Sequence, residues 1–143
     1  VRGEEVLGEW HSLLQPDRRV PKFITQLTGI SDAMLSDAPR FEAVAAELRA
    51  FCGDAVFVAH NAGFDYRFIC SEFERLDQEF KLPTLCTKVQ SRRWFPGLAS
   101  YGLAALCGHF GIDLKNHHRA RCDALATVEL LKRINRRRRE AGV

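Results

Sequence analysis

Apolar residues recur at helical spacing through much of the chain. The first such set is Phe41, Val44, Leu48 and Phe51. Gly53 follows this set as a helix stop, which predicts an amphipathic helix between Pro39 and Gly53. Further helices are predicted over about residues 63–77, 88–95, 101–112 and 119–138. Along residues 63–77 we expect one apolar stripe made of Phe64, Phe68, Phe73 and Leu76.

Short continuous apolar runs predict strands between these helices. "AVFVAHN" (55–61) and "LPTLCT" (82–87) are typical of short strands, and residues 5–14 favour a strand that Pro16 stops. Residues 21–39 mix apolar clusters with turn formers, which predicts short helical turns and loops. Strands separated by helices indicate an α/β layered domain.

Length and composition indicate one domain with one core. The chain has 143 residues, of which 46% are hydrophobic. No apolar run approaches membrane-spanning length, so we expect no membrane partner. The five cysteines are odd in number, scattered, and never in a C-x-x-C pair. They predict reduced thiols in a cytoplasmic protein and argue against a disulfide framework or a zinc site.

Positive charge gathers at the end of the chain. The formal net charge is +3, and Lys132, Arg133 and Arg136 to Arg139 supply much of the basic character. Such a run suits a polyanionic partner and equally suits a solvated helix end.

Two segments combine histidine with aspartate at helix entrances. In "HNAGFD", His60 and Asn61 close a predicted strand and Asp65 lies in the next helical turn, where ligands of α/β proteins gather. An acid there can equally be a helix N-terminal residue that the macrodipole favours by about 0.3–1 kcal/mol.

The second segment is "HHRARCD", residues 117–123. Asp123 shares a helix face with residues that we expect to face the core, namely Ala120, Ala124, Thr127, Val128, Leu131 and Ile134. An acid on a mostly buried face is costly unless it is paired or binds a metal. The alternatives are a simple ion pair with a neighbour such as Arg119, and a loop or capping role for the histidine.

Together these segments resemble a known enzyme family. "HNAGFDYRFI" and "HRARCDALAT" look like motifs II and III of the DEDDh 3′-to-5′ exonucleases, the family of the proofreading epsilon subunit of DNA polymerase III and of ribonuclease T. Four residues separate His118 from Asp123, so this spacing selects His118 and not His117. The resemblance implies a ribonuclease H-like mixed sheet flanked by helices.

The resemblance also implies a site with two metal ions, Mg²⁺ or Mn²⁺. Asp123 is the expected direct metal ligand, Asp65 binds metal directly or through water, and His118 is the general base. The substrate contacts expected by analogy are Phe64 and Ile30 beside the terminal nucleobases and His60, Asn61 and Gly29 at the pocket floor. Plain core packing is the alternative for Phe64 and Ile30.

One family motif has no counterpart in the sequence. The Asp-x-Glu of motif I is expected on a first strand, whereas residues 1–16 match the end of a second strand, a turn at Glu4 and Glu5, and a third strand. We therefore expect residues 1–143 to be an N-terminally incomplete exonuclease domain that lacks strands one and two. Alone, it is expected to be inactive.

The predicted function is release of nucleoside monophosphates from single-stranded or frayed DNA 3′ ends, with RNA as the other possible substrate. Proofreading beside a DNA polymerase subunit is the expected setting. The alternatives are a catalytically inactive nucleic-acid-binding or interaction module on the same fold, and a DNA-binding protein that uses Arg136 to Arg139. An upstream Asp-x-Glu strand would favour the enzyme.

Overall fold

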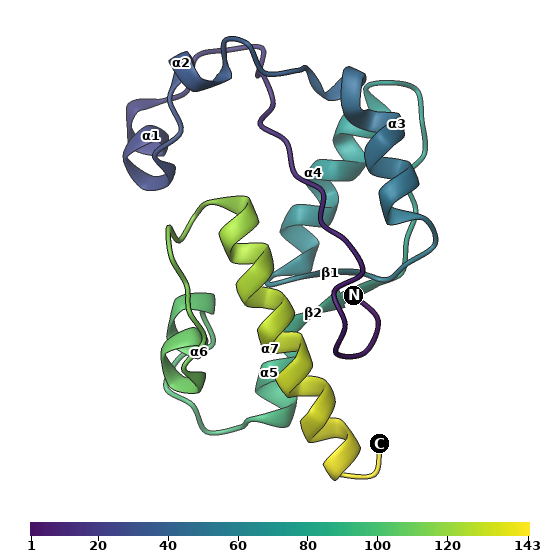
Figure 1. The fold of residues 1–143 in the computed structure, drawn as a ribbon, viewed down its shortest axis with the longest axis vertical. Helices are drawn as coiled ribbons and strands as arrows, with labels where there is room; N and C mark the ends of the chain where they lie inside the picture. The colour runs from purple at the N-terminus through teal and green to yellow at the C-terminus, as the bar shows by residue number, and fades with distance from the viewer.

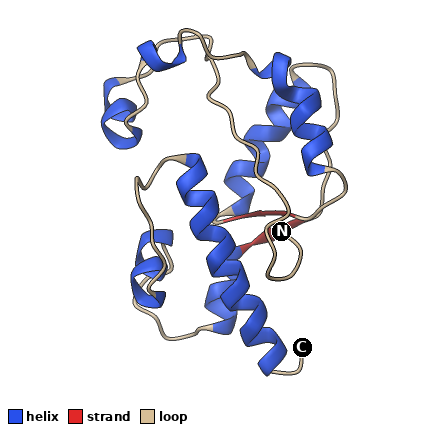
Figure 2. Cartoon of the chain, viewed as in Figure 1, coloured by secondary structure: helices blue, strands red, loops and turns tan.

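The computed structural model describes residues 1–143. In chain order, the elements are α1 (Lys22–Thr28), α2 (Asp32–Leu35), α3 (Phe41–Cys52), β1 (Phe57–Ala59), α4 (Ala62–Glu74), β2 (Thr84–Cys86), α5 (Thr87–Trp94), α6 (Leu103–Phe110) and α7 (Ala120–Glu140). Helices dominate, and the two strands are short (Figures 1 and 2). None of the helices is both long and apolar enough to cross a membrane.

The sheet consists of β1 and β2, which run parallel. Phe57 pairs with Thr84 and Ala59 with Cys86, so both strands end at the same edge. Helix α4 connects them, and α5 continues directly from β2 (Figure 1). Both predicted short strands and the α/β class are therefore confirmed, with a small parallel sheet and helices.

The predicted strand over residues 5–14 is wrong. An isolated antiparallel bridge joins Arg2 to Glu5 around a turn, where Gly3 has a φ of 62°. Beyond this turn the chain runs as irregular backbone towards α1 (Figure 1). Strand propensity depends on pairing and packing, and no neighbouring strand lies alongside these residues. The expected turn at Glu4 and Glu5 is present.

The larger hydrophobic cluster lies between α6 and α7. Its buried members are Leu103, Leu106, Cys107, Ala126, Leu130 and Ile134. Helix α6 ends at Gly111, which takes a left-handed φ of 65° that glycine adopts easily. Helix α7 also packs along α5, so this cluster anchors the helix that carries Asp123 (Figure 1).

A second cluster joins α3 to α4. Phe73 and Phe80 stack with ring centroids 4.7 Å apart, and Ala45 of α3 packs beside them. The apolar stripe expected on α4 is wrong at two positions, because Phe64 and Phe68 are 54% and 57% exposed. The buried residues of α4 are Ala62 and Phe73. Exposure of Phe64 and Phe68 leaves two aromatic rings beside Asp65.

Candidate active site

Asp65 lies where the sheet ends and α4 begins. Asn61 follows β1 in a left-handed conformation, with a φ of 77°, and turns the chain into the helix. The carbonyl of Asn61 accepts a hydrogen bond from the backbone N–H of Phe64 at 3.0 Å. This sharp turn places Asp65 in the first turn of α4, at the end of the sheet where β2 also finishes.

Asp123 lies in the first turn of α7 and contacts His117. Nδ1 of His117 lies 2.8 Å from Oδ1 of Asp123, and both side chains are about one-third exposed. The ionised carboxylate can only accept, so Nδ1 of His117 carries the proton. The alternative of an ion pair between Asp123 and Arg119 is not observed, because the guanidinium of Arg119 contacts the carbonyls of Thr28 and Gly29.

The core-facing stripe expected around Asp123 is partly confirmed. Thr127 and Ile134 are buried, whereas Ala120 and Ala124 are exposed. Burial raises the pKa of the Cys107 thiol, and the charge of Asp123 raises it further. Asp123 therefore lies at the border between the α6–α7 cluster and solvent.

The two aspartates influence each other although they come from distant segments. Partial burial of its carboxyl raises the pKa of Asp65, and the negative charge of Asp123 raises that pKa further. A hydrogen bond from the backbone of Asp65 itself opposes this rise. The N-terminal turns of α4 and α7 thus bring two carboxylates towards one region.

His117 and His118 lie against each other beside Asp123. Their ring centroids are 3.9 Å apart. One possible metal-ligand atom from each histidine and one from Asp123 all lie within 4.8 Å of one another. Asn116 and His118 have positive φ angles of 49° and 71°, which turn the loop sharply around His117. The sequence did not predict the contact between His117 and Asp123, because motif spacing selected His118. The two adjacent histidines are the sequence signal that could have predicted it.

Arg119 ties the loop that carries His117 and His118, the histidine loop, to the loop of Gly29 and Ile30, the Gly-Ile loop. Its guanidinium donates to the carbonyl of Thr28 and, at 3.2 Å, to the carbonyl of Gly29. Gly29 has a φ of 71°, and a Cβ there would approach Nη2 of Arg119 to 3.1 Å. The backbone N–H of Ile30 donates to Oγ1 of Thr28 at 3.1 Å, and the Ile30 side chain is half-buried.

His60 is held on both sides by the protein. Its Nε2 lies 2.8 Å from the carbonyl oxygen of Tyr101 and its Nδ1 lies 2.9 Å from Oγ1 of Thr87. Burial lowers the pKa of His60, the hydrogen bond with the carbonyl of Tyr101 opposes this fall, and the charge of Lys88 lowers the pKa further. In the neutral ring, Nε2 donates to Tyr101 and Nδ1 accepts from Thr87. Both polar atoms of His60 are therefore occupied, whereas Asn61 and Phe64 are exposed to solvent.

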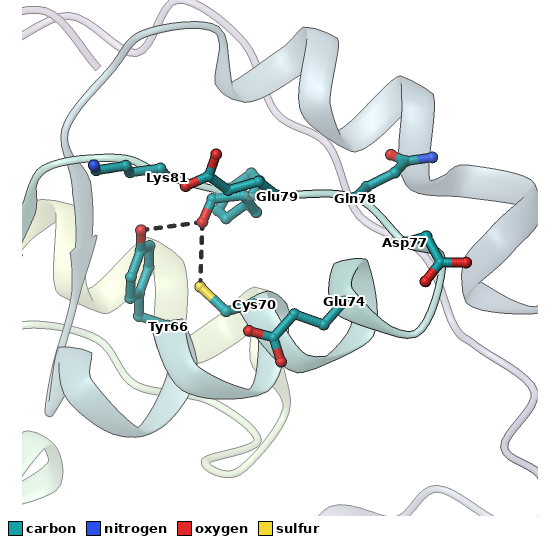
Figure 3. Close-up of a pocket in the computed structure, with 8 residues that line it drawn as sticks. Tyr66, Cys70, Glu74, Asp77, Gln78, Glu79 and Lys81 are labelled. Carbon is teal, nitrogen blue, oxygen red and sulfur yellow. Dashed lines mark hydrogen bonds between the residues drawn. The ribbon is translucent and has the colours of Figure 1, made fainter.

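A separate hollow lies along α4 and the loop that follows it. Figure 3 shows the hydroxyl of Tyr66 and the thiol of Cys70 both directed at the carbonyl of Phe80, each at 3.4 Å. Glu74, Asp77 and Glu79 border the same hollow. None of the candidate site residues lines it. Tyr66 and Cys70 therefore fix the loop after α4.

Comparison with known proteins identifies the family. The family model RNase_T, described as exonuclease, matches residues 1–131. A solved structure of exonuclease X in complex with 5′ overhanging duplex DNA superposes with a TM-score of 0.76 and 29% sequence identity. That superposition covers 94% of this chain and 76% of the other chain.

Curated relatives agree with this assignment. DNA polymerase III PolC-type from Halalkalibacterium halodurans is 40% identical over 135 residues, covering 94% of this chain and 9% of that protein. The 3′-5′ exonuclease DinG from Staphylococcus epidermidis is 39% identical over 132 residues, covering 92% of this chain and 15% of that protein. The chain thus spans a small part of these relatives and belongs to the RNase_T exonuclease family, as its resemblance to the DEDDh exonucleases predicts.

Proposed function

We propose that this domain is a metal-dependent 3′-to-5′ exonuclease that releases nucleoside monophosphates from single-stranded or frayed DNA ends. The observation that carries the proposal is that Asp65 and Asp123, in the first turns of α4 and α7, lie close enough for the charge of Asp123 to add to the rise in the pKa of Asp65 that burial causes. Two neighbouring carboxylates can bind a cation between them. The histidine pair beside them can supply the proton acceptor.

The residues present fit Mg²⁺ or Mn²⁺. Both ions prefer oxygen ligands, and a cation between Asp65 and Asp123 would offset the burial that chiefly raises the pKa of Asp65 as well as the smaller repulsion by Asp123. Asp123 would hold the metal directly, and Asp65 would hold it directly or through water. A bound pair of such ions supplies charge neutralisation on the phosphoryl oxygens and a more acidic water.

The histidine loop supplies the proton acceptor. His118 is exposed, whereas His117 is engaged with Asp123. We assign His118 the role of general base, which takes the proton from the attacking water. His117 donates its Nδ1–H to the carboxylate of Asp123 and so fixes the orientation of that carboxylate.

The exposed aromatic rings and the Gly-Ile loop favour a nucleic-acid end as the substrate. Phe64 is exposed next to Asp65, and stacking on an aromatic ring tolerates any base. Gly29 and Ile30 are tied to the histidine loop through Arg119, which supports a substrate contact on the same side as the proposed base. His60 and Asn61 complete the end of β1 as the pocket floor.

The relatives support the biological setting of this activity. One relative carries 3′-5′ exonuclease in its name and another is a DNA polymerase III. We propose DNA ends as the substrate, with proofreading beside a polymerase subunit in the cytoplasm. Single-stranded RNA ends remain the comparison substrate for the assay.

A catalytically inactive nucleic-acid-binding module is the second candidate. Its supporting observation is that the site contains two carboxylates, Asp65 and Asp123, whereas two hard cations need several oxygen ligands. We therefore propose that residues 1–143 alone turn over no substrate. The enzyme needs further oxygen ligands, such as those of an Asp-x-Glu strand, whereas the binding module needs none.

Direction and activity can be tested together. DNA labelled at its 5′ end or its 3′ end is incubated with Mg²⁺ and the domain, alone or preceded by an Asp-x-Glu strand. The domain with the Asp-x-Glu strand, called the extended protein below, should shorten 5′-labelled strands stepwise. From 3′-labelled strands it should release the labelled mononucleotide first. Residues 1–143 alone should do neither. An extended protein that folds and binds single-stranded DNA without degrading it would establish the binding module instead.

A further inference from the structure

We infer that His117, His118 and Asp123 form a binding site for a transition-metal ion of the Zn²⁺ class, distinct in ligand chemistry from the magnesium site. Donor atoms of these three side chains lie within 4.8 Å of one another. Only the expected effect of bound Zn²⁺ on turnover rests on the proposed function. Binding itself depends on the three side chains alone.

The spacing of the donor atoms fits Zn²⁺ after small side-chain rotations. Zn²⁺ holds imidazole nitrogen and carboxylate oxygen at about 2.0–2.2 Å, so neighbouring ligand atoms lie roughly 3.3–3.5 Å apart in a tetrahedral site. His117 Nδ1 and Asp123 Oδ1 are 2.8 Å apart, somewhat closer than this, and Zn²⁺ would replace the proton that Nδ1 donates to the carboxylate, which is released to solvent. The exposed ring of His118 can rotate to supply the third ligand, and water can take the fourth position.

The loop already gathers the three ligands before any metal binds. The rings of His117 and His118 are in contact, with centroids 3.9 Å apart. The left-handed backbone of Asn116 and His118 forms this bend. The hydroxyl of Thr127 donates to the carbonyl of Asp123 at 2.8 Å. This bond and the buried α6–α7 cluster fix the start of α7. Little ordering is therefore left for the metal to impose.

Ligand type selects the ion. Two imidazoles with one carboxylate suit Zn²⁺, Co²⁺ or Ni²⁺, whereas Mg²⁺ prefers an all-oxygen environment. Asp123 belongs to both proposed sites, so Zn²⁺ and Mg²⁺ would compete for it. Zn²⁺ would also occupy the imidazole of His118 and prevent it from accepting a proton. The predicted consequence is inhibition of the exonuclease by Zn²⁺.

Binding is measured on residues 1–143 without a polyhistidine tag, by calorimetric titration with ZnCl₂ and, separately, with MgCl₂. His117→Ala, His118→Ala and Asp123→Asn should each weaken Zn²⁺ binding by about tenfold or more. His109→Ala is the matched control, since His109 is exposed on α6 against Phe110. It should leave Zn²⁺ affinity unchanged. Circular dichroism confirms that each variant remains folded.

Cobalt reports the ligands directly. Co²⁺ bound to wild type should give the visible bands of a four-coordinate nitrogen and oxygen site, and these bands should be lost in His117→Ala. A sulfur-to-cobalt charge-transfer band would show that a cysteine binds the ion and would overturn the site. Unchanged Zn²⁺ affinity in His117→Ala, or Zn²⁺ binding no tighter than Mg²⁺ binding, would overturn it as well.

The effect on turnover is assayed separately in the extended, Mg²⁺-activated protein. Zn²⁺ should inhibit wild type near the dissociation constant measured at the same Mg²⁺ concentration, and His117→Ala should need at least tenfold more Zn²⁺ relative to its own zinc-free rate. If the extended protein degrades nothing while Zn²⁺ binding still follows the three variants, the exonuclease proposal fails and the metal site stands. Inhibition that is equal in both proteins would refute the link between them.

Discussion

The guanidinium of Arg119 donates to the carbonyl oxygen of Gly29 at 3.2 Å and also reaches the carbonyl of Thr28. This contact joins the C-terminal end of α1 to the loop that precedes α7. It holds the proposed nucleobase contacts and the proposed base in one unit.

Removal of this tie should loosen the unit. Arg119→Ala should lower the free energy of unfolding by about 1–3 kcal/mol, because two backbone carbonyls lose a charged donor. Chemical denaturation measures the change, and Arg67→Ala, at an exposed position on α4, is the matched control. Equal stability of the two variants would contradict a structural role for Arg119.

His60 should make the stability of the protein depend on pH. Burial lowers the pKa of His60 in the fold from the ordinary value of 6.5, so the unfolded chain binds a proton at higher pH than the folded chain does. The stabilisation is therefore complete above pH 6.5 and is lost as the pH falls through the lowered pKa. Urea unfolding between pH 8 and about pH 5 measures this effect.

The matched variants for this prediction are His60→Gln and His109→Gln. His60→Gln should flatten the fall in stability below neutral pH, because glutamine binds no proton there. His109→Gln, at an exposed position, should leave the wild-type profile unchanged. A steep acid loss that persists in His60→Gln would assign the effect to other groups.

The two faces of α4 should respond differently to the same substitution. Phe73 is fully buried against Phe80, so Phe73→Ala should cost about 3–5 kcal/mol of stability. Phe68 is 57% exposed, so Phe68→Ala should cost much less. Calorimetric melting compares them. A larger loss in Phe68→Ala would contradict the observed burial of α4.

Phe64 and Phe68 also provide a test of substrate stacking. Their ring centroids are 4.9 Å apart on the exposed side of α4. Phe64→Ala should weaken binding of single-stranded DNA by about 1–3 kcal/mol if a base stacks on the ring. Fluorescence anisotropy measures this affinity. Val89→Ala is the control, because Val89 is an exposed apolar residue on α5. Unchanged affinity would remove Phe64 from the substrate site.

Local sequence patterns predicted most helices and strands. The predictions that failed depend on contacts between segments distant in the sequence. Gly53 and Gly111 marked the ends of α3 and α6 because glycine takes positive φ easily. The strand over residues 5–14 failed because its propensity needs a neighbouring strand. Phe64 and Phe68 failed as core residues because helical spacing alone does not say which face meets the rest of the protein.

The candidate site shows the same division. The motif spacing brought Asp65, His118 and Asp123 to attention, but the contact between His117 and Asp123 depends on the left-handed backbone of Asn116 and His118. His60 was expected at the pocket floor, and its bonds to Thr87 and Tyr101 join segments that no local pattern links. The roles in substrate binding stay predictions.

His118 and Asp123 should fail in different ways. In the extended protein, His118→Ala should lower kcat by about 10²–10⁴-fold with little change in Mg²⁺ affinity, because it removes a proton acceptor. Asp123→Ala should weaken Mg²⁺ binding itself. Rates measured across a range of Mg²⁺ concentrations separate the two effects, and rescue of His118→Ala by added Mg²⁺ would contradict the base role.

The central claim is that Asp65 and Asp123 hold one metal together, and a double-substitution cycle of Mn²⁺ binding tests it most directly. Electron paramagnetic resonance measures free Mn²⁺ with the extended wild type, Asp65→Asn, Asp123→Asn and the double variant. Shared ligation predicts that each single substitution removes most of the affinity and that the double variant is little worse than either. Independent, additive losses, or no loss in Asp65→Asn, would contradict a shared metal site.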